Sequence, residues 1–469
     1  MHSKYNPSQE VPVIPQENGI PVTEGFFLVV GIGGGYHIKN LLQNLTSYLI
    51  VAVEADKESL CYCKTFPEVK ELSSNKNIIF CSKENLAAVL LQNYIPSRYG
   101  NFNIFVQRAW QNENPTEYSK IDAITKETLK NISNDYSVQA HFGKIWMSNI
   151  MSNLMTFKGN PIIKVNSELT AAVIAAGPTL DDSIKKLKEN RDSYCIIATD
   201  TTYGSLTKSD IQPDFIVSVD AQQVSTAHFL DCPDSLESQN KTTFIFDICT
   251  NPSIPAYIRS KGHPVFFIQS GHPLSRLAAE KTKFPYVETG AGTVTIACCD
   301  IARLLNFKCI ELFGADFAYS KGKPYAKGTY LETLFMSSAT RVEPQETKFS
   351  ALMYRTALQK KDSIKSERVF TSEVLHRYEK TLIEWAEIHG YTKKEQLLKC
   401  SSNVQTHQIT VAESFNFSTF VQEWTIGLKE KKYDETLLPY IAFLQSRKSK
   451  NTNISELYEQ AYAKAFRYT

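Results

Sequence analysis

Short apolar runs alternate with longer amphipathic segments between about residues 160 and 320. The runs have the length and the β-branched and aromatic content of buried strands, and each intervening segment is long enough for a helix. Strands that alternate with helices are joined by right-handed crossovers, so they lie parallel in one sheet with helices on both faces. The pattern predicts an α/β fold with a doubly wound, Rossmann-like parallel sheet over residues 158–330. The six runs are 171–176, 195–198, 215–217, 243–246, 265–268 and 310–313.

A smaller α/β unit is predicted ahead of this sheet. The glycine-rich turn 31–35 stands between an apolar run and an apolar-periodic stretch that leads to a second run, which is the order strand, turn, helix, strand. Helical spacing then continues to about residue 157. We expect an N-terminal Rossmann-like domain with a helical linker over residues 25–157, after a flexible stretch over residues 1–24. The strand-like runs are 26–30, 49–53, 77–80 and 102–105.

The last third of the chain has a different character. Amphipathic stretches with helical spacing follow one another, and Gly390 is placed to end the first of them. We therefore predict a C-terminal helical domain over residues 331–469, with Trp385 and Trp424 in its core. The apolar stripes contain Leu375, Tyr378, Leu382 and Trp385, then Phe417, Phe420, Val421, Trp424 and Leu428, then residues 436–447 and 453–467.

Composition limits the class of protein. Of 469 residues, 42% are apolar and 21% are charged, which is typical of a folded globular chain and excludes a disordered or fibrous one. A net charge of +2 provides no broad basic field for nucleic acid or an anionic membrane. No apolar run approaches the roughly 18 residues of a membrane helix and the first residues lack a secretory pattern, so we expect a cytoplasmic protein. Ten cysteines without a C-x-x-C pair indicate reduced thiols.

Aspartates follow the predicted strands, at the edge where an open parallel sheet binds its ligands. Each one alone is better explained as a helix cap. Gathered in one cleft they raise one another's pKa, and such a set can bind ribose hydroxyls, hold a metal, or act as acid or base. We expect the set to be functional, together with the neighbouring Thr201, Thr202 and Gln222. The strand-end aspartates are Asp200, Asp220, Asp247 and Asp316.

Two turns at strand ends have both a structural and a functional interpretation. Gly177, Pro178 and Thr179 begin a helix at the sheet edge, where free N–H groups favour a phosphate, but Thr179 with Asp182 also forms a variant capping box. The turn 289–293 opens a helix of small residues, which indicates either close packing on the sheet or a ligand held against backbone.

The N-terminal turn is a weaker nucleotide signal. Gly31, Gly33 and Gly35, with Glu54 about twenty residues on, suggest a nucleotide or S-adenosylmethionine site in which the acid takes ribose hydroxyls. Tyr36 stands where the dinucleotide fingerprint has its third glycine, and a tight turn between strand and helix explains the glycines equally well. The chain contains no P-loop, G-x-S-x-G or H-E-x-x-H motif, which disfavours P-loop kinases, serine hydrolases and zincins.

An ordered set of segments resembles the motility-associated factor (Maf) flagellin glycosyltransferases. The resemblance covers roughly residues 25–390 and implies transfer of a nonulosonic acid, pseudaminic or legionaminic, from its CMP derivative. The implied partner is flagellin, whose Ser and Thr hydroxyls are the acceptors. The segments are 176–180, 198–202, 213–222 and 312–319, with 31–38 similar to the leading domain of that family.

The central domain also resembles bacterial sialyltransferases that use CMP-sialic acid. This resemblance implies a catalytic set of Asp220, Asp316 and Tyr325, in which the Tyr325 hydroxyl stabilises the departing phosphate. It places the CMP phosphate on the turn that ends at Thr179 and the cytidine on residues 289–293. The implied donor-binding residues are Gly177, Pro178, Thr179, Asp200, Thr201, Thr202, Gln222, Thr289, Gly290, Gly292, Thr293 and Lys327.

The general base is left open by the sequence. The similar sialyltransferases use a histidine beyond the last strand, and this chain has no histidine between His272 and His376. Asp220, Asp316 and His272 are the candidates. Helix-end N–H groups can stabilise the phosphate without an Asp-x-Asp metal motif, which the chain lacks, so we expect no cofactor and no metal requirement.

Three other functions compete with glycosyl transfer. The central domain also resembles archaeal pterin diphosphokinases, in which the strand-end aspartates would hold magnesium and ATP. A non-catalytic flagellin-binding factor would explain the missing histidine. Methyl transfer would use the turn at Gly31 together with Glu54.

Overall fold

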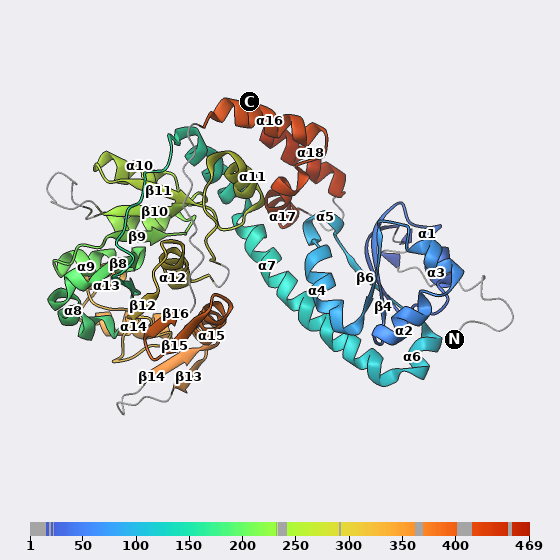
Figure 1. Ribbon diagram of the computed structural model, residues 1–469, viewed down its shortest axis with the longest axis horizontal. Helices are drawn as coiled ribbons and strands as arrows, with labels where there is room; N and C mark the ends of the chain where they lie inside the picture. Colours follow the sequence, from blue (N-terminus) through green and yellow to red (C-terminus); the bar gives the residue numbers. More distant parts are fainter. Residues whose placement is uncertain are drawn as a thin grey trace. The chain divides into compact units, whose positions relative to one another are not determined.

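The computed structural model divides the chain into two compact units (Figure 1). The first consists of Met1–Lys144 and Glu430–Tyr468, and the second of Ile145–Lys429. The predicted flexible stretch over residues 1–24 lies almost entirely outside the described residues. The structure describes residues 16–17, 20–21, 23–230, 232, 242–289, 292–361, 369–400, 415–448 and 453–469.

The first unit is built on a parallel sheet, as predicted. Its strand order is β5-β4-β3-β6, and nearly every residue of β3 is buried because helices cover both faces. Phe26, Leu28 and Val30 pack into the core on one face, and Phe27 and Val29 into the core on the other. The strands are β3 (Glu24–Val30), β4 (Ser47–Glu54), β5 (Ile78–Ser82) and β6 (Phe102–Val106). The helices are α1 (Tyr36–Leu42), α2 (Lys57–Cys63), α3 (Pro67–Leu72), α4 (Lys83–Asn93), α5 (Pro96–Tyr99) and α6 (Arg108–Glu113).

Eight of the described strands of the second unit form one sheet in the order β11-β10-β9-β8-β7-β12-β16-β15. The two strands Leu358–Lys361 and Val369–Ser372 pair with each other in a separate sheet. Strands β7 to β12 are parallel, which confirms the predicted doubly wound sheet. The chain winds outward from β7 to β11 and returns to place β12 on the other side of β7, so the strand order reverses between β7 and β12. The strands are β7 (Thr170–Ile174), β8 (Tyr194–Thr199), β9 (Phe215–Ser218), β10 (Thr243–Asp247), β11 (Val265–Ile268) and β12 (Cys309–Phe313).

Helix α12 (Val294–Leu304) explains the small residues that follow the turn 289–293. Ala297, Cys298 and Cys299 are fully buried and belong to the same core as Val173 and Val217 of the sheet. Small side chains let the helix approach the strands closely. The other helices of this unit that begin at strand ends or cover the sheet are α8 (Leu180–Glu189), α9 (Tyr203–Lys208), α10 (Ser253–Ser260) and α11 (Pro273–Thr282).

The segment expected to be one C-terminal helical domain, residues 331–469, is divided between the two units among the described residues. The predicted helices are present, and Trp385 and Trp424 are buried as expected. Four short strands also occur there, and β16 extends the central sheet by pairing antiparallel with β12. The elements are α13 (Tyr330–Ser337), α14 (Gln345–Met353), β13 (Leu358–Lys361), β14 (Val369–Ser372), α15 (Glu373–Ile388), β15 (Tyr391–Lys394), β16 (Leu397–Cys400), α16 (Phe417–Lys429), α17 (Leu438–Gln445) and α18 (Ile454–Ala465).

Helix α7 (Pro115–Thr156) is the predicted helical linker, and it begins in the first unit and ends in the second (Figure 1). All ten cysteines of the chain are free thiols, and most are buried. Among the described residues, no helix has the length and apolar character needed to cross a membrane.

Candidate functional site

The carboxyl ends of β7 and β12 meet where the strand order of the central sheet reverses, which is the usual ligand position in such folds. The backbone N–H of Gly177 donates to the carbonyl of Gly314 at 2.8 Å. A Cβ at position 177 would lie 2.5 Å from that carbonyl oxygen and 2.6 Å from Oδ2 of Asp316. Glycine is therefore required at position 177 because the loop after β12 packs directly on it.

Asp316 occupies the turn that the sequence assigned to a phosphate. The N–H of Thr179 donates to Asp316 Oδ2 at 2.9 Å, and the Thr179 hydroxyl donates to the other carboxylate oxygen. Burial raises the pKa of Asp316. A phosphate at this helix N-terminus would have to displace the carboxylate or bind beside it, so the turn is not an open phosphate cradle in this conformation.

A segment that we call the crossing segment, residues 325–330, runs over the carboxyl ends of β7, β8 and β9. The N–H of Ala326 donates to the carbonyl of Ala176 at the end of β7, at 2.9 Å. A Cβ at Gly204, in α9 after β8, would lie only 2.8 Å from the carbonyl oxygen of Gly328. The segment ends at Tyr330, beside the aspartates that follow β8 and β9. It therefore joins the three strand ends into one polar site.

Tyr325 is the centre of this site. Burial is the main cause of its raised pKa, and the phenols of Tyr319 and Tyr330 raise that pKa further. The phenol of Tyr378 also lies close enough to raise the Tyr325 pKa, while the guanidinium of Arg355 lowers it. We call Tyr319, Tyr325, Tyr330 and Tyr378 the tyrosine cluster.

Arg355 is a functional candidate that sequence reasoning missed. It stands between α14 and β13 and is exposed, and its guanidinium acts on the pKa of both Tyr319 and Tyr325. Among the described residues no acid, carbonyl or hydroxyl pairs with it, whereas the nearby Lys361 is paired with Glu379 at 2.7 Å. No motif marks a lone arginine between a helix and a strand, so only the fold shows that it belongs to the site.

Asp200 and Asp220 lie in this site, as the strand-end rule predicted, and each holds its own loop. Asp200 is buried and accepts from the Thr201 N–H at 2.7 Å and from the Ser218 hydroxyl at 2.6 Å. Asp220 accepts from the Gln222 N–H at 3.0 Å and from the Ser225 hydroxyl at 2.5 Å. Both carboxylates therefore shape the loops that follow β8 and β9.

Tyr330 and His228 complete the site, and the sequence analysis named neither. Burial raises the pKa of Tyr330, and the carboxylates of Asp220 and Asp200 raise it further. The ring of His228 meets the Tyr330 ring edge-on, with centroids 4.4 Å apart. His228 lies eight residues after Asp220, in the segment that follows β9, and this position near a strand end was the available signal.

Two asparagines of α7 fix the loops after β9 and β10. The amide nitrogen of Asn149 donates to the carbonyls of Ala221 and Cys249 at 3.1 and 2.9 Å. The amide nitrogen of Asn153, one turn later, donates to Ile248 and Thr250 at 2.9 and 2.8 Å. Both side chains are buried, so α7 positions the backbone that follows Asp220.

Three of the predicted donor-binding residues have side chains that are either buried in a structural contact or exposed. Thr202 is fully buried, and its hydroxyl donates to the carbonyl of Thr199. The Lys327 side chain is exposed and lines a cavity of about 630 Å³ beside Lys208 and Met336, on the outer side of the crossing segment. The side chain of Gln222 is exposed as well.

Gly292, just before α12, lies beside Tyr378 of the tyrosine cluster. A Cβ at Gly292 would lie 3.6 Å from the Tyr378 hydroxyl, and Thr293 caps α12. Thr289 closes the turn, because its carbonyl accepts from the Gly292 N–H at 2.9 Å. Gly290 lies outside the described residues.

His272 is half-buried, and Asp247 is fully buried. Burial lowers the pKa of His272 to about 3, and its Nδ1 accepts from the Leu274 N–H at 3.1 Å, so the other ring nitrogen carries the proton. A histidine in this state is a poor general base near neutral pH. Asp247 is fully buried, and its carboxylate accepts from the Cys249 N–H at 2.6 Å.

Side chains of the N-terminal unit fill the space beside the N-terminal glycine turn. Glu54 is buried and accepts from the N–H groups of Ile32 and Ala55 at 3.0 and 3.1 Å, and from the indole of Trp110. A Cβ at Gly31 would lie 2.6 Å from the Trp110 side chain, so the indole fills the space above the turn. A similar overlap with Val69 occurs at Gly35, while Gly33 adopts positive φ. The geometry gives the glycines and Glu54 a structural role.

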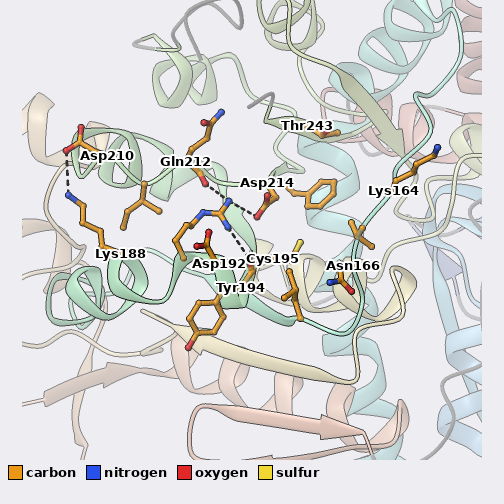
Figure 2. Close-up of a pocket in the computed structure, with 15 residues that line it drawn as sticks. Lys164, Asn166, Lys188, Asp192, Tyr194, Cys195, Asp210, Gln212, Asp214 and Thr243 are labelled. Atoms are coloured by element: carbon orange, nitrogen blue, oxygen red, sulfur yellow. Dashed lines mark hydrogen bonds and ion pairs between the residues drawn. The ribbon is translucent and has the colours of Figure 1, made fainter. Parts of the chain in front are cut away.

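A cavity of about 630 Å³ lies at the opposite, amino-terminal edge of the central sheet (Figure 2). Arg191 lines this cavity. Its guanidinium donates to the carbonyls of Tyr194 and Gln212 at 3.0 Å and to Asp214 at 2.9 Å. The contacts join the starts of β8 and β9, which gives this charged group a structural role. No group of three or more His, Cys, Asp or Glu side chains that could hold a metal occurs in the described part of the chain.

Comparisons with known proteins add the following similarities. Residues 144–322 match a family model described as 6-hydroxymethylpterin diphosphokinase MptE-like. An uncharacterized protein of Treponema pallidum (strain Nichols) is 28% identical over 232 residues, which is 49% of this chain and 77% of the relative. A second uncharacterized protein of that organism is 35% identical over 147 residues, 31% of this chain and 70% of the relative. The solved structure of a Maf glycosyltransferase from Magnetospirillum magneticum AMB-1 aligns with a TM-score of 0.48 and 14% identity, over 95% of this chain and 74% of that one.

Proposed function

This chain belongs to the same family as the 35% identical protein of Treponema pallidum, and from the geometry of its own site we propose that it is a glycosyltransferase. The proposed donor is a CMP-activated nonulosonic acid, pseudaminic or legionaminic, and the proposed acceptors are Ser and Thr hydroxyls of flagellin. The resemblance of the segments 176–180, 198–202, 213–222 and 312–319 supports the donor class. The same segments meet at the carboxyl edge of the central sheet.

The observation that carries the proposal is the combination of Arg355 with the tyrosine cluster. Arg355 has no hydrogen-bond or ion-pair partner among the described residues, and its guanidinium is close enough to Tyr319 and Tyr325 for its charge to lower the pKa of both phenols. Guanidinium groups bind phosphate and carboxylate oxygens in bidentate geometry, and a CMP-nonulosonate carries both anions. We therefore propose Arg355 as the anion-binding group of the donor site.

The proposed chemistry divides between the two ends of the site. As the bond from the anomeric carbon to phosphate breaks, negative charge develops on the phosphate, and Arg355 with the Tyr325 hydroxyl stabilises it. Because burial raises the pKa of Tyr325, its phenol stays protonated and can donate. Asp200 and Asp220 lie where the positive sugar and its hydroxyls would be held.

The proposal is tested by ligand-induced thermal stabilisation of the full-length protein. CMP, CMP-pseudaminate and CMP-legionaminate at 100 times their dissociation constants should each add about 2.7 kcal/mol, which is a readily measured shift in melting temperature. The shift should be lost in Arg355→Ala and retained in Arg341→Ala, an exposed arginine of the same region. Equal shifts in both variants would show that Arg355 does not bind the donor. Absence of a shift with every CMP compound in the wild type would overturn the proposed donor class.

A second candidate function is favoured by the match of residues 144–322 to the pterin diphosphokinase-like model. In that case Asp200 and Asp220 would bind magnesium with ATP, and a pterin alcohol would be the acceptor. The two functions separate in the same assay. Stabilisation by ATP with magnesium, abolished by EDTA and absent with CMP, would support the kinase and contradict glycosyl transfer.

A further inference from the structure

His228 lies against Tyr330 in the proposed site. It belongs to the short 3₁₀ segment Gln223–Phe229, which follows Asp220 after β9. Its ring contacts the Tyr330 ring edge-on, with an interplanar angle of 89° and centroids 4.4 Å apart. Tyr330 in turn lies close enough to Asp220 and Asp200 for their charges to act on its phenol. Ring packing thus holds His228 beside the strand-end carboxylates.

The ring of His228 has unused hydrogen-bonding capacity. It makes no hydrogen bond to any residue in the described ranges, and its enclosed Nδ1 has no partner there. The neighbouring polar groups are already used, because Asp220 holds its own loop through Gln222 and Ser225. Asp316, the other acid named as a base, accepts two hydrogen bonds from Thr179. The His228 imidazole makes no hydrogen bond of this kind to the described residues, so we choose it over the two aspartates as the proton acceptor.

We propose that His228 is the general base of the transfer, an assignment that rests on the proposed glycosyltransferase function. The acceptor Ser or Thr hydroxyl gives its proton to a ring nitrogen of His228. Its oxygen forms the new bond to the anomeric carbon of the sugar, while the bond from that carbon to the phosphate oxygen breaks. The electron pair leaves on CMP, and His228 returns the proton to solvent.

In the proposed reaction Arg355 and Tyr325 take the leaving phosphate, and His228 takes the proton of the acceptor. Tyr330 is a positioning residue, because its ring contacts the His228 ring. In this proposal a histidine in the segment after β9 is the general base. The similar sialyltransferases have their histidine base beyond the last strand.

The test uses the full-length protein with flagellin and CMP-nonulosonate, and follows both CMP release and the mass of flagellin. His228→Phe keeps an aromatic ring against Tyr330 and removes the nitrogens, so it separates packing from proton transfer. We expect His228→Phe to lower turnover at least 100-fold, in line with the usual contribution of a general base, with unchanged CMP binding. In His228→Ala, added imidazole should restore part of the lost rate.

Each alternative outcome has a distinct meaning. Wild-type turnover in His228→Phe would overturn the assignment of the base while leaving the transferase intact. Equal loss of CMP binding and turnover in both variants would show that His228 serves the structure of the site, and would also overturn the assignment. A wild-type protein that neither releases CMP nor glycosylates flagellin would overturn the proposed function itself.

Discussion

At the scale of single residues, the polar side chains divide into two groups. Some make hydrogen bonds that stabilise the fold, and others make no hydrogen bond to the described residues. Glu54 and Asp247 accept hydrogen bonds from groups around them, and Thr202 donates to a backbone carbonyl, although each stands at a position typical of ligand binding. Arg355 and His228 make no hydrogen bond to the described residues and lie in the site. The sequence pattern drew attention to Glu54, Asp247 and Thr202. Arg355 and His228 were recognised as candidates only from the packing of the folded chain.

Glu54 provides a prediction for the N-terminal unit. In Glu54→Gln the amide nitrogen cannot accept the hydrogen bonds that the carboxylate accepts, so the free energy of unfolding should fall by about 1 to 3 kcal/mol. Glu58→Gln, exposed on the following helix, is the matched control. Urea denaturation measures both. A variant as stable as its control, or a wild type stabilised by S-adenosylmethionine, would contradict the structural role of Glu54.

Asp316 gives the protein a predicted pH dependence. Burial raises its pKa above the ordinary value of 3.8, so the folded state binds the proton more tightly than the unfolded state does. The stability contributed by the protonated form is present below pH 3.8 and is lost as pH rises through the raised pKa. The stability of Asp316→Asn relative to wild type should therefore increase from about pH 4 to pH 7. A difference that stays constant over this range would show that the pKa of Asp316 is not raised.

At the scale of elements, the segment from residue 145 to the end of α7 positions the site through two asparagines. Removing the Asn153 amide leaves the carbonyls of Ile248 and Thr250 without their donor in a buried position. Asn153→Ala should lower the free energy of unfolding by about 1 to 3 kcal/mol and weaken CMP binding. Asn134→Ala, exposed earlier on the same helix, should do neither. Unchanged CMP affinity in Asn153→Ala would show that the loops hold their shape without α7.

The same scale shows how far the sequence predicts the fold. The parallel strands were predictable because each is a nearly continuous apolar run bounded by turns. Strands β13 to β16 were missed because each has four residues, and β13 and β15 are rich in lysine, so their pairing partners decide their structure. The strand-end rule found Asp200, Asp220 and Asp316. It could not find Arg355 or Tyr378, which reach the site from elements that follow the sheet in the chain.

At the scale of the whole molecule, residues 430–468 complete the N-terminal unit, and the helical domain expected at the end of the chain is therefore divided. Helices α17 and α18 pack on one another and on α5. A Cβ at Gly143 of α7 would lie 1.7 Å from the carbonyl oxygen of Pro439, so the two helix backbones are in direct contact there.

Gly143→Ala should therefore destabilise the first unit without affecting the second. We expect a drop of about 1 to 3 kcal/mol in the unfolding transition of the N-terminal unit, from overpacking. CMP-induced stabilisation of the second unit should remain at the wild-type value. Calorimetry with and without CMP separates the two effects. Loss of CMP stabilisation in Gly143→Ala would contradict the independence of the two units.

The central claim is that the carboxyl edge of the central sheet transfers a sugar. It is tested most directly by the intact mass of flagellin after incubation with the purified protein and CMP-pseudaminate or CMP-legionaminate. The account predicts added mass equal to one or more nonulosonic acid residues with wild type and with Arg341→Ala, and at least tenfold less product with Arg355→Ala and with Tyr325→Phe. Unmodified flagellin with both donors, or full activity in Arg355→Ala and Tyr325→Phe, would contradict it.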